Sequence, residues 1–142
     1  MSLRTEKFPE VRAILFTFTP PLSMPADVIT GLTESAAFKR EIGAPISRIF
    51  DLTQIAIRFT DILMGLAIEK GFEGGFYDPE VYTVILGQEE WLTVGLEVMK
   101  SHPSYKKTNV VGSVHTREEA LALAQKLAET RRMPPRPCES GR

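Results

Sequence analysis

Segments with the composition of β-strands alternate along the chain with segments of helical periodicity. The strand-like segments are rich in branched and aromatic residues and span residues 11–19, 46–52, 81–86 and 109–115. Helical spacing of apolar residues covers residues 26–41, a stretch that begins near Thr60 or Asp61, residues 88–102 and residues 117–129. This alternation predicts an α/β fold, in which about four helices pack on a mostly parallel sheet of four to five strands.

Breaker and capping residues set the expected ends of several elements. Pro20 and Pro21 cannot donate hydrogen bonds to a sheet and therefore end the first strand. Thr116 and Glu119 have the spacing of a capping box, which starts the last helix. The chain from Phe18 to Met24 can fold back as a short hairpin strand, so we expect an antiparallel edge strand on the N-terminal side of the sheet.

The length of 142 residues predicts one domain with a core large enough to need no disulfide or structural metal. We expect an N-terminal extension over residues 1–10, the domain over residues 11–130 and a disordered tail over residues 131–142. The tail contains three prolines and four arginines and has little that can pack. Cys138, which lies in it, is the single cysteine and forms no intramolecular bridge.

Charge and hydropathy exclude two classes of partner. The chain has 17 basic and 18 acidic residues, and no basic stripe is present to bind a nucleic-acid backbone. The apolar runs are much shorter than the roughly 20 residues of a membrane span. The first ten residues also lack the apolar core of a signal peptide, so a cytoplasmic protein is expected.

The sequence lacks the motifs of common catalytic and cofactor sites. The glycines of residues 71–75 follow a helix, and no phosphate-binding loop with a lysine is present. His102 and His115 have no Cys, His or paired carboxylate at ligand spacing, so no metal and no cofactor are expected. An enzyme that acts through Asp51, Asp61 and His115 remains an alternative, although such residues also serve as helix caps.

The aromatic residues after the second helix allow two interpretations. Phe72, Phe76 and Tyr77 lie in a glycine-rich loop that either folds under itself or makes contact with a ligand or partner. Trp91, in the first turn of the third helix, either packs on the sheet or faces a partner. These four residues are therefore candidates for a ligand or partner site.

The turn between the second strand and the second helix is the main candidate site. Asp51 and Thr53 follow the strand, and Thr60 and Asp61 stand at the expected start of the helix. Thr and Asp are preferred N-caps because their oxygens accept free backbone N–H groups of the first turn. A helix start at the carboxyl end of a parallel strand also favours anions such as a phosphoryl group.

The chain resembles the STAS domain family, which includes the anti-sigma factor antagonists. The resemblance runs from about Val11 to Glu129 and is strongest in "RIFDLTQIAIRFTDILMGL", an apolar strand ending in Asp, a short turn and a helix start. The later segments "VYTVILGQEEWLTVGLEVMKSH" and "NVVGSVHTREEAL" follow the family's order of strand, helix, strand and capped helix.

This resemblance implies a non-enzymatic interaction module with a phosphorylatable Ser or Thr at the start of a helix. The family's D-S-[ST]-G-L pattern falls on Phe59, Thr60, Asp61, Ile62 and Leu63. Phe59 replaces the acidic residue, Ile62 replaces the glycine, and the acceptor position falls on Asp61. An Asp there imitates a phosphate with about half of its charge. Thr60 is the acceptor if the alignment shifts by one residue.

We therefore expect a protein that binds another protein, or a second copy of itself in a homodimer, through the second helix and the loop after it. A carrier or sensor of a small apolar ligand is the alternative. Its pocket would lie between the second and third helices, and the aromatic loop of residues 71–79 would cover it.

Overall fold

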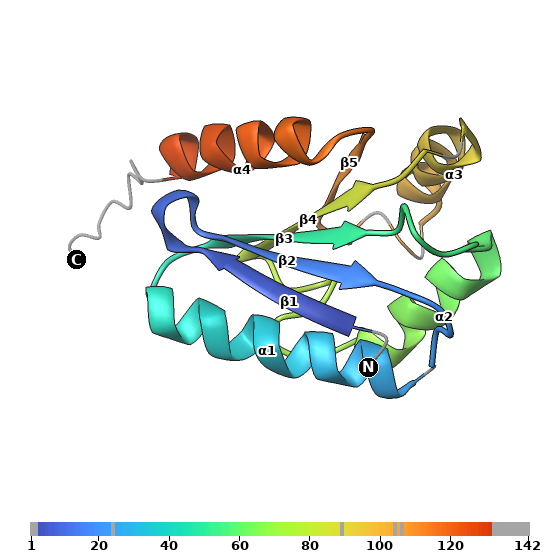
Figure 1. The fold of residues 1–142 in the computed structure, drawn as a ribbon, viewed down its shortest axis with the longest axis horizontal. Coiled ribbons are helices and arrows are strands. Elements are labelled where there is room, and N and C mark those ends of the chain that lie inside the picture. The colour runs from blue at the N-terminus through green and yellow to red at the C-terminus, as the bar shows by residue number, and fades with distance from the viewer. Residues whose placement is uncertain (1–2, 24, 89, 104, 106, 132–142) are drawn as a thin grey trace.

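The computed structural model describes residues 3–23, 25–88, 90–103, 105 and 107–131. It contains one five-stranded sheet and four α-helices (Figure 1). The strands are β1 (Leu3–Phe8), β2 (Ala13–Phe18), β3 (Ile46–Asp51), β4 (Val81–Leu86) and β5 (Val110–Val114). The helices are α1 (Ala26–Ile42), α2 (Phe59–Glu69), α3 (Glu90–Ser101) and α4 (Arg117–Arg131), with a short 3-10 helix, η1 (Pro9–Val11), between β1 and β2. The predicted α/β fold is confirmed.

The sheet has the strand order β1-β2-β3-β4-β5. β1 is antiparallel to β2, and all later neighbours are parallel. Three right-handed crossovers that advance in one direction place their helices on the same face of a sheet. Accordingly, residues of α1, α2 and α3 share one hydrophobic cluster, whereas α4 packs with a second cluster on the opposite face. Figure 1 shows the sheet between α1 and α4.

β2 shows how the chain builds the two clusters. Its side chains alternate, with Ile14, Phe16 and Phe18 in the larger cluster and Ala13 and Leu15 in the smaller one. All six residues of this strand are buried. The alternation follows from the two-residue period of a strand and explains why "AILFTF" is apolar almost throughout, since both faces of the strand are covered.

The N-terminal edge of the sheet differs from the prediction. The antiparallel strand is β1, which pairs from Leu3↔Phe18 to Phe8↔Ala13, and the stretch after Phe18 forms no strand among its described residues. The residues expected as an extension, 1–10, thus include the edge strand. The expected tail, residues 131–142, lies outside the described residues apart from the end of α4 at Arg131.

A buried ion pair holds α2 against the sheet. Arg48 of β3 donates to both carboxylate oxygens of Glu69, at 3.0 and 2.8 Å, and to the carbonyl of Gly74 at 3.0 Å. Both charged side chains are fully buried. The guanidinium lies 4.5 Å from the ring centroid of Phe50 and 4.7 Å from that of Phe76. The apolar character of "ISRIFD" gives no hint that its one arginine points inward.

A second ion pair fastens the loop after α2 to α1. Lys39 donates to Asp78 at 2.8 Å, and the backbone N–H groups of Gly74 and Glu80 donate to the same carboxylate at 2.8 and 2.9 Å. Burial alone would raise the pKa of Asp78, but these hydrogen bonds outweigh it and hold the pKa below its ordinary value. Asp78 is therefore charged in the folded protein down to a lower pH than in the unfolded chain.

Asp78→Asn is expected to lower the free energy of unfolding at pH 7 by about 1–2 kcal/mol, because it removes a charged hydrogen-bond acceptor. A lowered carboxyl pKa stabilises the fold above the unfolded pKa, and this contribution is lost as the pH falls below about 4. The difference between the variant and the wild type should therefore shrink in acid. Urea unfolding at pH 7 and pH 3 measures it, and an equal difference at both values would contradict this assignment.

Candidate functional site

The second helix starts close to the predicted position. Its first residue is Phe59, and Arg58 occupies the N-cap, so Thr60 and Asp61 lie in the first turn rather than at the cap. The backbone N–H of Arg58 donates to Oδ2 of Asp61 at 2.9 Å. From within the first turn, Asp61 therefore accepts the hydrogen bond of the N-cap backbone N–H, as the acidic residue of a capping box does.

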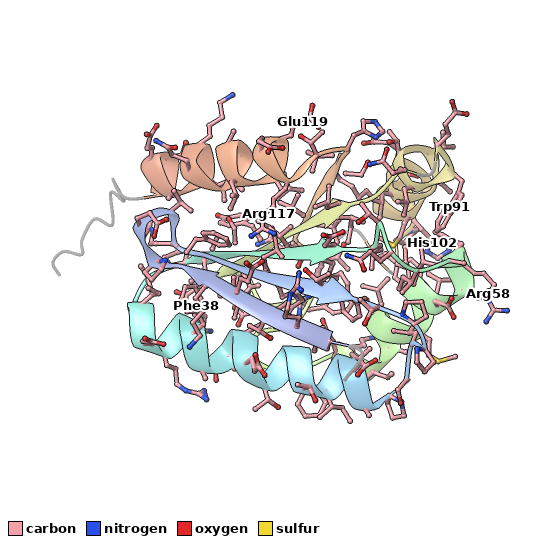
Figure 2. The ribbon with its side chains drawn as sticks, in the orientation of Figure 1. Phe38, Arg58, Trp91, His102, Arg117 and Glu119 are labelled. Carbon is pink, nitrogen blue, oxygen red and sulfur yellow. The ribbon has the colours of Figure 1, made fainter. Side chains whose placement is uncertain are left out.

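Asp61 and Thr60 differ in their surroundings. The hydrogen bond from the backbone of Arg58, assisted by the Arg58 guanidinium, lowers the pKa of Asp61 despite its burial. The Asp61 side chain is 12% exposed, whereas Arg58 points away from the protein (Figure 2). Thr60 is exposed. Of the two residues, Thr60, the candidate for phosphorylation, is therefore the more accessible.

Asp51 and Thr53 do not join this group. The backbone N–H and the hydroxyl of Thr53 both donate to Oδ1 of Asp51, at 3.0 and 2.6 Å. Asp51 pairs with Leu86 in the sheet and so faces the side of α4. The pKa of Arg117 is raised first by its hydrogen bond to Glu6 and also by the charge of Asp51. The charge of Asp51 thus acts on Arg117, on the α4 side of the sheet.

An apolar cavity lies beside Asp61, on the opposite face of the sheet from Asp51. It has a volume of about 50 Å³ and is lined by α1, α2, the carboxyl ends of β2 to β4, the loop between β3 and α2, and Phe76. The lining side chains are mostly apolar, and Asp27, Asp61 and Glu69 are also among the lining residues. The cavity therefore differs in position from the predicted pocket between the second and third helices. α3 contributes no lining residue to it.

The four aromatic candidates occupy different environments. Phe76 is buried and lines the cavity, Tyr77 packs half-buried against the larger cluster, and Phe72 is 59% exposed. Trp91 meets the ring of Phe59 edge-on, with ring centroids 6.3 Å apart, and so joins α3 to the start of α2. The aromatic loop is thus folded under itself except at Phe72.

Large apolar side chains are exposed on both α2 and α3, and on α3 they alternate with the exposed Glu90, Thr93 and Glu97. The charged residues of α2 are Asp61 and Glu69, and its exposed positions are Thr60, Met64 and Ala67. On α3, Val94 and Val98 are 65% and 61% exposed. We call Phe59, Leu63 and Met64 of α2 with Trp91, Val94 and Val98 of α3 the α2–α3 surface.

Helical geometry explains the exposed valines. At about 100° per residue, the apolar positions of α3 cover about 200° of its circumference. The core takes up the part that contains Leu92, Leu96 and Met99, and Val94 and Val98 fall outside it. Their spacing of four residues was a signal in the sequence for a second apolar stripe on this helix.

The remaining candidates do not assemble into a catalytic site. No hydrogen bond among the described residues joins any two of Asp51, Asp61 and His115. His102 and His115 are both exposed, and the backbone N–H of His115 donates to Glu119 at 2.9 Å. Within the described part of the chain, no group of three His, Cys, Asp or Glu side chains is placed to hold a metal ion.

Comparisons with known proteins add no relative. Neither the family models nor the curated proteins nor the solved structures include a match to this chain. The described helices include none with the length and apolar character needed to cross a membrane. The resemblance to STAS domains therefore stays a prediction from the sequence.

Proposed function

We propose that the protein is a non-enzymatic regulatory module that binds a protein partner through the α2–α3 surface. The observation that carries this proposal is the exposure of Met64, Val94 and Val98 on two helices joined by the Phe59–Trp91 contact. Exposed apolar side chains gathered on one face are typical of protein interaction sites. Large aromatic side chains such as Trp91 supply much of the binding energy where they are desolvated.

Thr60 gives this surface a means of regulation. It is exposed in the first turn of α2, one helical turn before Met64. A phosphoryl group there would add about two negative charges beside the positive end of the helix dipole, so α2 would remain folded. The same charge would oppose burial of the neighbouring apolar side chains, because a desolvated and unpaired charge is costly. Phosphorylation at Thr60 is thus proposed to release the partner.

Single charges placed on this surface are expected to reduce binding of the partner at least tenfold, because they would be buried at the interface. Met64→Glu and Val98→Glu each place a charge on this surface, and Thr60→Glu imitates the charge of a phosphorylated Thr60. Thr60→Val removes the hydroxyl without adding charge and is expected to retain binding. Ala122→Glu, at an exposed position of α4, is the control for a charge elsewhere.

Affinity capture from the source cells, quantified by mass spectrometry for each variant, measures these effects. Sedimentation of the purified chain identifies the case in which the partner is a second copy, since the same variants should then convert a dimer to a monomer. Circular dichroism confirms that the variants are folded. Equal retention by the wild type and the charged surface variants, together with unchanged sedimentation, would overturn the proposal.

A further inference from the structure

Two glycines face the cavity from the interiors of adjacent helices. Gly31 lies in the first half of α1 and Gly65 in the middle of α2, and both are buried and line the cavity. Glycine inside a helix is less favourable than alanine, because its backbone loses more conformational freedom on folding. Both helices therefore carry a destabilising residue at the cavity wall.

Close packing of the helices does not account for these glycines. A Cβ atom at Gly31 would have no neighbouring heavy atom within 4 Å, and at Gly65 it would meet only Cε2 of Phe76 at 4.0 Å. Gly74 shows the opposite case, since a Cβ there would lie 2.7 Å from the backbone nitrogen of Ala36. Alanine thus fits at Gly31 and at Gly65 without a clash.

We infer that this cavity is a binding site for a small uncharged apolar molecule, a ring or a short hydrocarbon chain, and that Gly31 and Gly65 keep it open. Its walls include Phe18, Val28, Phe50, Ile62 and Ile85, which provide contacts for an apolar ligand. The site is independent of the α2–α3 surface, because none of the residues that define that surface lines the cavity.

The described residues that line the cavity include no Lys, Arg or His that could pair with an anionic ligand. Glu69 is paired with Arg48, Asp61 accepts from the backbone of Arg58, and Asp27 accepts from the backbone N–H of Ser23 at 2.9 Å. Each carboxylate is thus held by a group of the protein itself. A ligand with a carboxylate would bring a further negative charge to this low-dielectric space, so the ligand class is uncharged.

The size of the cavity sets which probes test the inference. At about 50 Å³ it is smaller than the cavity of about 150 Å³ that admits benzene in an engineered protein. Ile55 and Ile57, half-buried in the loop between β3 and α2, form the outer wall. The stretch from Leu52 to Arg58 has one backbone hydrogen bond within it, from Ile55 to Leu52 at 3.5 Å. The inference requires this wall to move outward when a ring binds.

The experiment titrates benzene and benzoate into the full chain and follows the backbone amide signals of residues 31 and 65 by NMR. The wild type is expected to bind benzene with a Kd below about 1 mM and to bind benzoate at least tenfold more weakly. Gly31→Ala and Gly65→Ala are each expected to weaken benzene binding at least tenfold. Both should also raise Tm by about 4 °C, because alanine favours the helix.

Gly95→Ala is the matched control, since Gly95 is a helix-interior glycine of α3 outside the cavity. Its added Cβ meets Phe59 at 3.3 Å, and benzene binding should stay as in the wild type. The inference is overturned if the wild type fails to bind benzene, which would make the cavity a packing defect only. It is also overturned if benzoate binds as well as benzene, or if Gly31→Ala and Gly65→Ala stabilise the fold and leave binding unchanged.

Discussion

Replacing Glu69 by alanine is expected to lower the free energy of unfolding by about 3–5 kcal/mol, because it leaves the buried Arg48 guanidinium without its counter-charge. Glu69 accepts two hydrogen bonds from Arg48 and a third from the backbone N–H of Phe76 at 3.0 Å. Because Arg48 is fully buried, water cannot solvate its charge once Glu69 is removed. Urea unfolding followed by circular dichroism measures the change.

Two further variants separate the buried charge from other effects. Glu41→Ala removes the exposed pair with Lys7 and should cost less than about 1 kcal/mol. The double change Arg48→Met with Glu69→Leu removes both charges, and it should cost less than Glu69→Ala even though the N–H of Phe76 and the carbonyl of Gly74 lose their partners. A double variant less stable than Glu69→Ala would contradict the role given to the unpaired guanidinium.

The second large effect is expected at Gly74, where Gly74→Ala should lower the free energy of unfolding by about 3 kcal/mol. Its φ of +88° is in the left-handed region, which costs a residue with a Cβ about 1–2 kcal/mol. The added Cβ would also lie 2.7 Å from the backbone nitrogen of Ala36 and 3.0 Å from the carbonyl oxygen of Leu32. Because both contacts are to the backbone of α1, overpacking adds about 1–3 kcal/mol.

Gly71→Ala is the control that isolates the backbone conformation. Gly71 has a φ of +83°, and a Cβ at this position would have no heavy atom within 4 Å. Its substitution should therefore cost about 1–2 kcal/mol, the left-handed conformation alone. Thermal unfolding of both variants gives the comparison, and equal losses at the two positions would show that the contact of Gly74 with α1 contributes nothing.

The sequence revealed the central elements of the fold because their patterns are strong. The segment "VYTVIL" coincides with β4, and the capping box at Thr116 stands just before α4, where the backbone N–H of Glu119 donates to the Thr116 hydroxyl at 3.1 Å. β1 was missed because "LRTEKF" is an edge strand with few neighbours to bury it. Its sequence is accordingly polar and reads as a solvated extension.

The candidate site was predictable only in part. The start of α2 was located to within two residues because the strand before it ends in Asp51 and the apolar periodicity resumes at Ile62. The position of the cavity was not foreseen, since an apolar pattern gives no signal for where empty space lies, and the alternative pocket was expected between the second and third helices. The role of Glu69, which lines the cavity, was also missed. Glu69 is at the end of a helix, and the sequence does not show that it pairs with a buried Arg48, because the burial of Arg48 depends on tertiary packing.

The two edges of the sheet bear on how the protein avoids polymerising through its strands. Arg4 and Lys7 are exposed on β1, and charged side chains on an edge strand discourage the addition of another chain. At the other edge β5 has five residues, and its register with β4 shifts between Thr83 and Val84. A short and irregular strand is a poor template for fibril growth. We expect concentrated solutions of the folded chain to resist conversion to cross-β aggregates.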